Sequence, residues 1–269
     1  MTATIKIEAK LSKNIVKLLV GDVEVFVIED CGNPLGAALF EGPTPAAKRS
    51  PYFKDGKVDT SVNMFLVHNK GQWILIDAGY GKALLPSLAT IGVKVEDIST
   101  ILITHMHPDH ISGLLNGNAA TFPKAKVFVS ENEKAFWVKG KGQTDADKVA
   151  EIYGTRFQTL KYGTEVAPGI ISVDLEGHTA GHTGYEIGSG VNHLLIAGDF
   201  LHHTALQFFC PEENASFDAD KPKSIKTRRL VMERASKEGF AVSGVHILFP
   251  GTGYVKKGEE NGYTFIPIQ

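Results

Sequence analysis

One six-residue segment constrains this chain more than any other. It reads His-Met-His-Pro-Asp-His and directly follows the apolar run Thr-Ile-Leu-Ile-Thr, whose composition predicts a buried strand. In extended backbone His105 and His107 point to one side, so both imidazoles can bind one metal ion at the strand end. Asp109 and His110 are adjacent and must diverge, and we expect the chain to turn into a helix there. They are better placed to serve a second metal ion nearby.

Three later segments supply ligand types that this one lacks. His178 lies in Gly-His-Thr-Ala-Gly-His, Asp199 follows an apolar strand, and His246 lies in the last strongly apolar run. Each stands at or near a predicted strand end, where the loops of a sheet gather on one rim. Since a carboxylate can bridge two cations, Asp199 is the candidate bridge. One ion would then take His105, His107, His178 and Asp199, and the other would take Asp109, His110, His246 and Asp199.

The composition excludes several classes of protein. The chain has 28 Lys and Arg against 30 Asp and Glu, a net charge of −2, so it lacks the basic surface that nucleic acid requires. The alternating N-terminal residues 1–10 lack the apolar core of a signal peptide, and no window reaches 18 apolar residues. We therefore expect a cytoplasmic protein, no membrane partner, and reduced thiols at Cys31 and Cys210.

The apolar patterns predict strand-rich segments closed by helices in each half of the chain. A hairpin is expected over residues 15–30 around Gly21-Asp22, and a long loop over residues 32–57. Further strands are expected over 61–68, 72–77, 100–104, 126–130, 169–175, 183–188, 193–197 and 242–248, with a tail at 263–268 that could pair with the last strand, and helices over 82–89, 131–139 and 224–238. This coarse symmetry indicates two sheets packed face to face with helices outside, in a single domain over residues 1–269.

The four motifs, in this order, resemble those of the metallo-β-lactamase superfamily. The resemblance implies an α/β fold, an αββα sandwich of two mixed sheets with the metal site in a cleft between the sheet edges. It also implies that His178 is the ligand of the third motif and that His182 supports the site. Two divalent cations are implied, with Zn²⁺ favoured, although nitrogen and oxygen ligands also bind Mn²⁺, Fe²⁺ or Co²⁺.

The predicted chemistry is hydrolysis. Two cations can lower the pKa of bound water from 15.7 towards ~7, so a metal-bound hydroxide is available without a serine or cysteine nucleophile. A carbonyl or phosphoryl group gains negative charge when hydroxide attacks it, and cations stabilise that charge. The sequence contains no Gly-x-Ser-x-Gly motif to suggest a competing mechanism.

The segment Phe-Pro-Gly-Thr-Gly at residues 249–253, after the last motif, resembles the branch that contains N-acyl-homoserine lactone lactonases and methyl parathion hydrolase. Three positions after the bridging Asp, that branch has Tyr or an apolar residue, whereas this chain has His202. Because a His can donate a hydrogen bond or a proton near neutral pH, it could replace the Tyr. Asp109 and His202 are the candidate catalytic residues. Trp137, Phe136, Met64 and His202 are the candidate substrate contacts.

Three functions are compatible with this site. The leading hypothesis is a dinuclear lactonase that opens the ring of N-acyl-homoserine lactones, and so quenches quorum signals. The second is an organophosphate triesterase or arylesterase of the methyl parathion hydrolase type. The third is a metal-bound ligand sensor without catalysis. The resemblance also suggests a homodimer.

Overall fold

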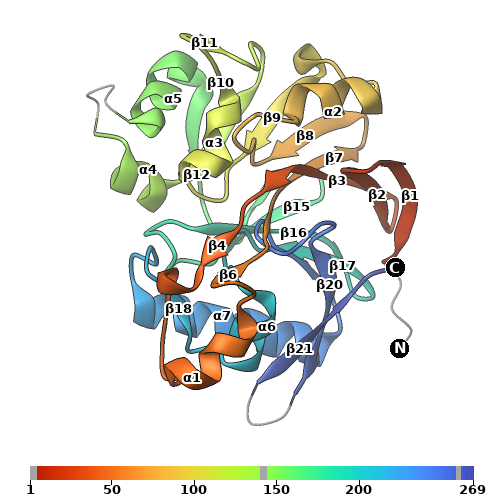
Figure 1. Ribbon diagram of the computed structural model, residues 1–269. Coiled ribbons are helices and arrows are strands. Elements are labelled where there is room, and N and C mark those ends of the chain that lie inside the picture. Colours follow the sequence, from red (N-terminus) through yellow and green to blue (C-terminus); the bar gives the residue numbers. More distant parts are fainter. Residues whose placement is uncertain (1–4, 140–143, 259–261) are drawn as a thin grey trace.

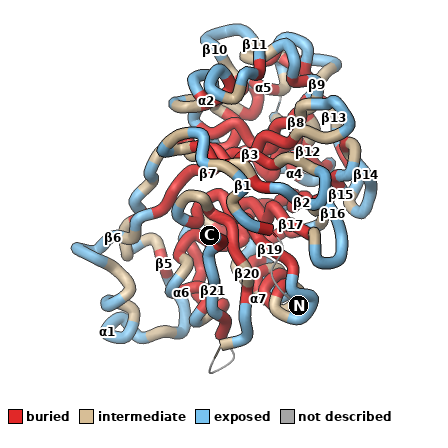
Figure 2. The backbone as a smooth tube through the Cα atoms, turned by 90° about the vertical axis from the view of Figure 1, so that its right-hand side faces the viewer, coloured by how far each residue is buried: buried red, intermediate tan, exposed pale blue. Residues whose placement is uncertain are grey.

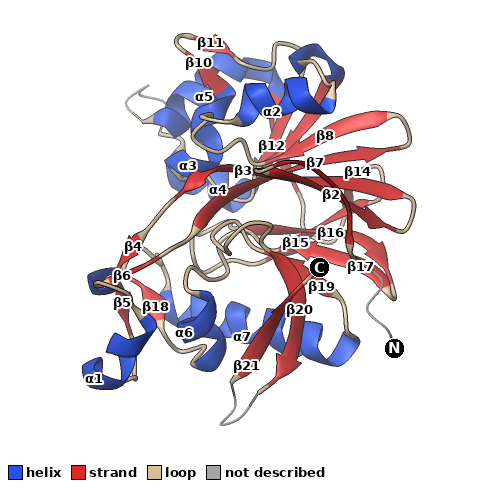
Figure 3. Ribbon diagram, turned by 45° about the vertical axis from the view of Figure 1, so that its right-hand side comes forward, coloured by secondary structure: helices blue, strands red, loops and turns tan. Residues whose placement is uncertain are grey.

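A computed structural model describes residues 5–139, 144–258 and 262–269. Two large sheets lie face to face, with helices on the outer face of each (Figures 1 and 3). The predicted αββα arrangement is therefore confirmed. In the described part of the chain, no helix is long and apolar enough to span a bilayer.

The first sheet has eight strands and comes from the first 160 residues. Its order is β1 (Ile7–Ser12), β2 (Ile15–Val20), β3 (Val23–Gly32), β7 (Ser61–Asn69), β8 (Gln72–Ile76), β9 (Ile98–Leu102), β12 (Lys126–Ser130) and β13 (Phe157–Leu160). The strands from β1 to β8 are antiparallel, and those from β8 to β13 are parallel. The predicted hairpin is β2 and β3, which turn at Gly21-Asp22, where Gly21 has φ +62°.

The second sheet has seven strands and comes from the rest of the chain. Its order is β14 (Glu165–Ala167), β15 (Ile170–Asp174), β16 (Thr183–Ser189), β17 (Asn192–Ile196), β19 (Ala241–Ser243), β20 (Thr252–Lys257) and β21 (Tyr263–Pro267). Only the pair of β17 and β19 is parallel among these strands. Strands β15, β17 and β19 therefore run in one direction, and their carboxyl ends meet at one rim.

Seven α-helices, all in the described residues, complete the layers. Helices α2 (Leu84–Ile91), α3 (Pro108–Ile111), α4 (Glu131–Trp137) and α5 (Asp145–Tyr153) cover the first sheet, whereas α6 (Thr204–Phe209) and α7 (Lys221–Glu238) cover the second (Figure 1). Helix α1 (Ala46–Arg49) lies in a long connection. Helix α7 ends where predicted, because Gly239 adopts the left-handed conformation with φ +76°.

The two sheets separate three apolar cores. One lies between the first sheet and its helices, one between the two sheets, and one between the second sheet and its helices. Along β7, Met64 and Leu66 pack towards the outer helices, while Phe65 and Val67 pack between the two sheets. This alternation explains why the strand is almost continuously apolar. Figure 2 shows the consequence: both sheets are buried along most of their length, and exposure concentrates in the loops and the long connection.

The predicted strand over residues 242–248 is wrong beyond Ser243. The buried Asn63 side chain donates hydrogen bonds to the carbonyl oxygens of Gly244, Val245 and Ile247, at 3.2, 3.0 and 2.6 Å. These hydrogen bonds hold the chain in a turn, so it does not form the backbone hydrogen bonds of a strand. The tail does pair, but with the unpredicted strand β20.

The long connection over residues 33–58, called the strap below, contains only short elements. They are β4 (Leu35–Gly36), a 3₁₀ turn (Ala37–Leu39), β5 (Phe40–Glu41), α1, a second 3₁₀ turn (Ser50–Tyr52) and β6 (Lys57–Val58). Strand β5 pairs with β18 (Asn214–Ala215), which anchors the strap to the second half of the chain. The small hairpin of β10 (Leu115–Asn116) and β11 (Ala119–Ala120) lies at the other end of the molecule (Figure 1).

Candidate metal centre

The predicted ligands converge because each follows the carboxyl end of a strand. The His105 to His110 segment follows β9, His178 follows β15, Asp199 follows β17 and His246 follows β19. As predicted, the chain enters a helix at Pro108. The two sheets face each other, so the loops at this rim bring residues from both halves of the chain together.

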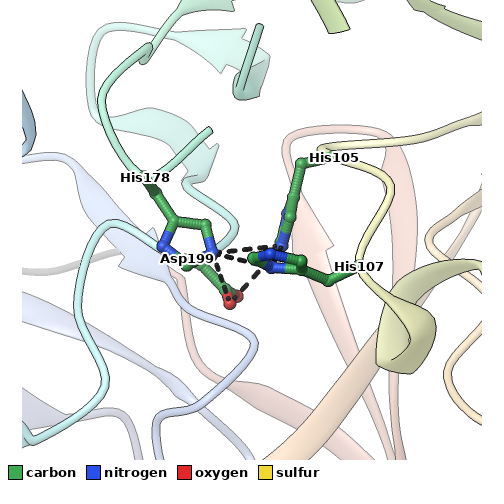
Figure 4. A group of neighbouring side chains, drawn as sticks. All are labelled: His105, His107, His178 and Asp199. Atoms are coloured by element: carbon green, nitrogen blue, oxygen red, sulfur yellow. Dashed lines mark hydrogen bonds and ion pairs between the residues drawn. The ribbon is translucent and has the colours of Figure 1, made fainter. Parts of the chain in front are cut away.

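The first group consists of His105, His107, His178 and Asp199. Figure 4 shows three imidazoles and one carboxylate pointing toward one another. The His105 Nε2 atom lies 2.8 Å from His107 Nδ1 and 3.2 Å from His178 Nε2. The latter two nitrogens are 3.0 Å apart. Asp199 Oδ2 lies 3.4 Å from His178 Nε2 and 3.7 Å from His105 Nε2. One ion can contact all four residues.

The second group consists of Asp109, His110 and His246. The His246 Nε2 atom lies 3.2 Å from Asp109 Oδ2, and His110 Nε2 lies 3.8 Å from the same oxygen. Asp199 stands between the two groups: its Oδ1 is 3.3 Å from His110 Nε2, while its Oδ2 faces the first group and is also 3.1 Å from His246 Nε2. The cluster is therefore suited to two ions with a shared carboxylate.

Two buried atoms support this assignment. His110 Nε2 and Asp199 Oδ1 are fully shielded from solvent and, although they lie 3.3 Å apart, neither forms a hydrogen bond with the other or with another described group. A buried polar atom without a partner costs about 1–3 kcal/mol. Since both atoms point into the same space, a divalent cation there would satisfy both.

The electrostatics of the cluster also favour cations. Burial holds the pKa of His105 well below its ordinary value, and burial with the nearby His178 lowers the pKa of His107 to about 3. Both rings are therefore neutral at pH 7, the form that binds metals. Burial alone would lower the pKa of His246, but the charge of Asp199 outweighs it and raises the pKa to about 10. The carboxylates thus favour positive charge at the second group.

Three groups outside the predicted motifs hold rings of the candidate ligands in place. His110 Nδ1 lies 2.8 Å from Asp77 Oδ2, and His178 Nδ1 lies 2.8 Å from Asp218 Oδ1. The third ring, His246, has its Nδ1 3.0 Å from the carbonyl oxygen of Ser61. Such contacts orient a ligating imidazole and fix its tautomer.

The other histidines near the centre take supporting positions. His182 accepts a hydrogen bond from the Asp199 amide at Nε2, and its Nδ1 donates to the Leu175 carbonyl oxygen. His203 points away from the ligands, because its Nε2 lies 3.0 Å from the Tyr52 carbonyl oxygen and its Nδ1 caps α6.

His202 stands at the edge of both ligand groups. Its Nε2 lies 3.0 Å from Asp199 Oδ2, and its ring stacks on that of His246 at 4.9 Å between centroids. Burial lowers the pKa of His202 to about 4. The geometry allows two roles, a contact to substrate or an additional metal contact.

A cavity of about 210 Å³ opens on the centre. It is lined by Asn33, Leu35, His107, Pro108, Asp109, Asp199, His202, Phe217 and His246. The apolar part of this wall, Leu35 and Phe217, was not predicted, since neither stands at a strand end or in a motif.

The predicted substrate contacts lie in different places. Trp137 is next to the centre, with its ring 5.2 Å from that of His107. Phe136 is 42% exposed and packs on Trp137, and Met64 is fully buried in the core under the first sheet. None of the three is among the described residues that line the cavity. The structure therefore brings Trp137 near the site but places Met64 in the core.

Solved structures similar to this one cover almost the whole chain. A crystal structure of the hydrolase AbOPH of the beta lactamase superfamily has a TM-score of 0.86 and 29% sequence identity, and covers 97% of this chain and 99% of that one. The dizinc quorum-quenching lactonase AidC, in complex with a product N-hexanoyl-L-homoserine, has a TM-score of 0.85 at 23% identity, with 95% and 98% covered. The likeness to AidC shows the fold alone.

Curated relatives match over part of their length. The uncharacterised protein YobT of Bacillus subtilis is 31% identical over 149 residues, which are 51% of this chain and 61% of that protein. The family model of the metallo-beta-lactamase superfamily matches residues 58–232, well over half of the chain. With the fold and the ligand cluster, this match shows that the chain belongs to the metallo-β-lactamase superfamily.

Proposed function

We propose that the protein is a dinuclear metal-dependent hydrolase that opens the ring of N-acyl-homoserine lactones. One observation carries the proposal: Asp199 lies between two groups of ligands at the floor of a cavity that is open to small molecules. His105, His107 and His178 would hold one ion, Asp109, His110 and His246 the other, and Asp199 would bridge them. When bound, two such ions supply Lewis-acid activation of a carbonyl and acidify water.

The protein's own residues would orient the substrate around these ions. Leu35 and Phe217 give the cavity an apolar wall, against which an acyl chain can pack while the ring faces Asp109 and Asp199. The cavity of about 210 Å³ is small beside typical ligand sites of about 300–1,000 Å³, so it suits a lactone ring with the chain extending outward.

His202 is the proposed contact to the leaving oxygen, because it forms part of the cavity wall beside Asp199. Since its lowered pKa leaves the ring neutral at pH 7, His202 would act as a hydrogen-bond donor, and we expect His202→Ala to lower lactone turnover by roughly 10²- to 10³-fold while metal content stays unchanged. Turnover and metal content would be measured on the same preparation, with His68→Ala, a surface ion-pair variant, as control. Full activity would remove His202 from the mechanism, and metal loss would make it a ligand.

A second candidate function is hydrolysis of organophosphate triesters or aryl esters, which the apolar cavity wall also suits. Values of kcat/KM for homoserine lactones, aryl esters and methyl parathion discriminate between the two, and near-equal values would contradict lactone specificity. Mass spectrometry of the incubated lactone tests for the gain of one water. An unchanged lactone would indicate a sensor.

Four further expectations belong to this proposal. They are Zn²⁺ as the native ion, a homodimer, a cytoplasmic location and a single-domain organisation. The donor set of imidazole and carboxylate supports Zn²⁺. Elemental analysis of the purified protein and its sedimentation behaviour test the ion and the assembly.

A further inference from the structure

Glu133 is a fully buried carboxylate beside the first ligand group. It stands in the first turn of α4, directly after β12, where its amide donates to the capping hydroxyl of Ser130 at 3.1 Å. The position resembles that of the ligands themselves, since β12 is parallel to β9 and ends at the same rim.

The carboxylate of Glu133 joins the two loops that carry the imidazoles of the first group. Its Oε1 accepts a hydrogen bond from the Met106 amide at 2.8 Å, and Met106 lies between His105 and His107. Its Oε2 accepts from the Thr179 hydroxyl at 2.7 Å and from the Gly181 amide at 2.9 Å. One side chain therefore fixes the loop of two imidazoles against the loop that begins at His178.

The lack of a side chain at Gly181 allows the loop after His178 to contact the start of α4. A Cβ atom there would lie 2.1 Å from the Glu133 amide nitrogen and 2.2 Å from Ser130 Oγ. Only glycine allows the turn after His178 to approach the start of α4 so closely. A separate backbone bond, from the Thr183 amide to the Thr104 carbonyl oxygen, joins the same two segments without Glu133.

We propose that Glu133 is a positioning residue that sets the metal affinity of the first group, His105, His107 and His178, and leaves that of the second group unchanged. The inference rests on the ligand assignment of the proposed function. The second group has its own backing, Asp77 behind His110 and the Ser61 carbonyl behind His246, and neither contact involves Glu133.

A carboxylate is required because three donors meet two acceptor oxygens. In Glu133→Gln an amide NH₂ would replace one of these oxygens and face either the Met106 amide or the donors of Thr179 and Gly181. At least one loop would then lose its anchor, whereas the volume of the side chain is kept. Loss of a backing contact of this kind lowers metal affinity by about 10- to 100-fold.

The test is a titration of the metal-free full chain with Co²⁺, followed by visible absorption, which reports the coordination of each ion. His107→Ala and His246→Ala assign the two binding steps to the two groups. We expect Glu133→Gln to weaken the first-group step by roughly 10- to 100-fold and to change the other by less than about threefold. Thr179→Val, which removes one donor, should show a smaller shift in the same step.

Glu213→Gln is the matched control. Glu213 is also a fully buried carboxylate, but its side chain contacts the strap through the Thr44 amide and Arg49. We expect its Co²⁺ titration to match that of the unaltered protein. A folded Glu133→Gln variant with two unchanged steps would overturn the proposal, as would equal weakening of both steps.

The remaining outcomes are separable. If Glu133→Gln does not fold, Thr179→Val decides, and an unchanged first step in that variant overturns the proposal. If the unaltered protein binds no Co²⁺, the proposed function fails with it. Two normal steps in the unaltered protein together with an insensitive Glu133→Gln variant contradict the role of Glu133 alone.

Discussion

Arg228 is a buried cation behind the proposed metal centre. It is 0% exposed and lies in α7, from which its guanidinium donates to the carbonyl oxygens of Phe200, Pro211 and Glu213. A further nitrogen lies 3.4 Å from Asp218 Oδ2, and the other oxygen of that carboxylate contacts His178. Arg228 thus neutralises the carboxylate that orients a proposed ligand.

We expect Arg228→Met to destabilise the protein by about 3–5 kcal/mol, because it leaves Asp218 buried without its cation and three carbonyl oxygens without a donor. Urea unfolding monitored by circular dichroism measures the change. The adjacent Arg229→Met is the control, since Arg229 is partly exposed and pairs with Glu212 at the surface. Such surface pairs contribute about 0–1 kcal/mol. Equal effects of the two variants would contradict the role given to Arg228.

At the scale of residues, the sequence indicated the candidate ligands better than the residues that orient them. His105 and His107 belong to a dense motif, so their chemistry is visible without the fold. Asp77 follows the apolar strand β8, and the same strand-end rule could have found it. Asp218 could not be found in that way, because it lies in an irregular loop 40 positions from His178 and meets it only through tertiary packing.

At the scale of elements, the strap shapes one side of the cavity. Its residues Asn33 and Leu35 line the cavity, and Phe40 packs with Leu206 of α6 in a small apolar cluster. The Arg49 guanidinium holds the strap in place by donating to the carbonyl oxygens of residues 40, 42 and 44 at 2.9–3.0 Å, and it pairs with Glu213.

Removing that guanidinium should loosen the strap and leave the sheets intact. Charged hydrogen bonds contribute about 1.5–3 kcal/mol, so we expect Arg49→Met to speed amide exchange of residues 40–53 by roughly 10- to 100-fold. Hydrogen exchange followed by mass spectrometry measures these rates. The control is Lys48→Met, which changes the exposed residue next to Arg49. Unchanged exchange in the strap would show that β5 and its pairing with β18 suffice to hold it.

At the same scale, an element could be predicted from the sequence when the residues that determine it are neighbours in the chain. The hairpin of β2 and β3 was found because turn residues and alternation are adjacent in the chain. The strap was correctly predicted as a long loop, but its anchors at Glu213 and β18 lie far along the chain. The strand over 242–248 was overestimated because Asn63, which lies 182 positions before Val245 and 184 before Ile247, donates hydrogen bonds to their carbonyl oxygens.

At the scale of the whole molecule, the proposed metal centre joins the two sheets. Four ligands follow β9 of the first sheet, and three follow strands of the second. An ion bound to both sets holds the sheets together in the folded state only. The amount by which its binding to the folded state exceeds its binding to the unfolded chain therefore adds to the free energy of unfolding.

Removing the ions should lower the melting temperature. At a free ion concentration of 1,000 times Kd, each ion contributes up to about 4.1 kcal/mol, the value without any binding to the unfolded chain, and a domain of this size shifts by roughly 2–4 °C per kcal/mol. We thus expect Tm to fall by about 10 °C or more after chelation and to recover with Zn²⁺. Mg²⁺ serves as the control, because it prefers oxygen ligands. If the chelator left Tm unchanged, that result would contradict the binding of an ion by residues of both sheets.

The proposed ligands are unevenly spaced along the chain, and this bears on the order of events when the protein folds with its ions. His105, His107, Asp109 and His110 lie within six positions, so they can gather around a cation before any long-range contact forms. His178, Asp199 and His246 reach the site only after the second sheet has docked on the first. The refolding rate should therefore depend on when the ion is added. An ion that is present early can bind a local segment of the unfolded chain, whereas an ion that is added late binds two sheets that have already packed together.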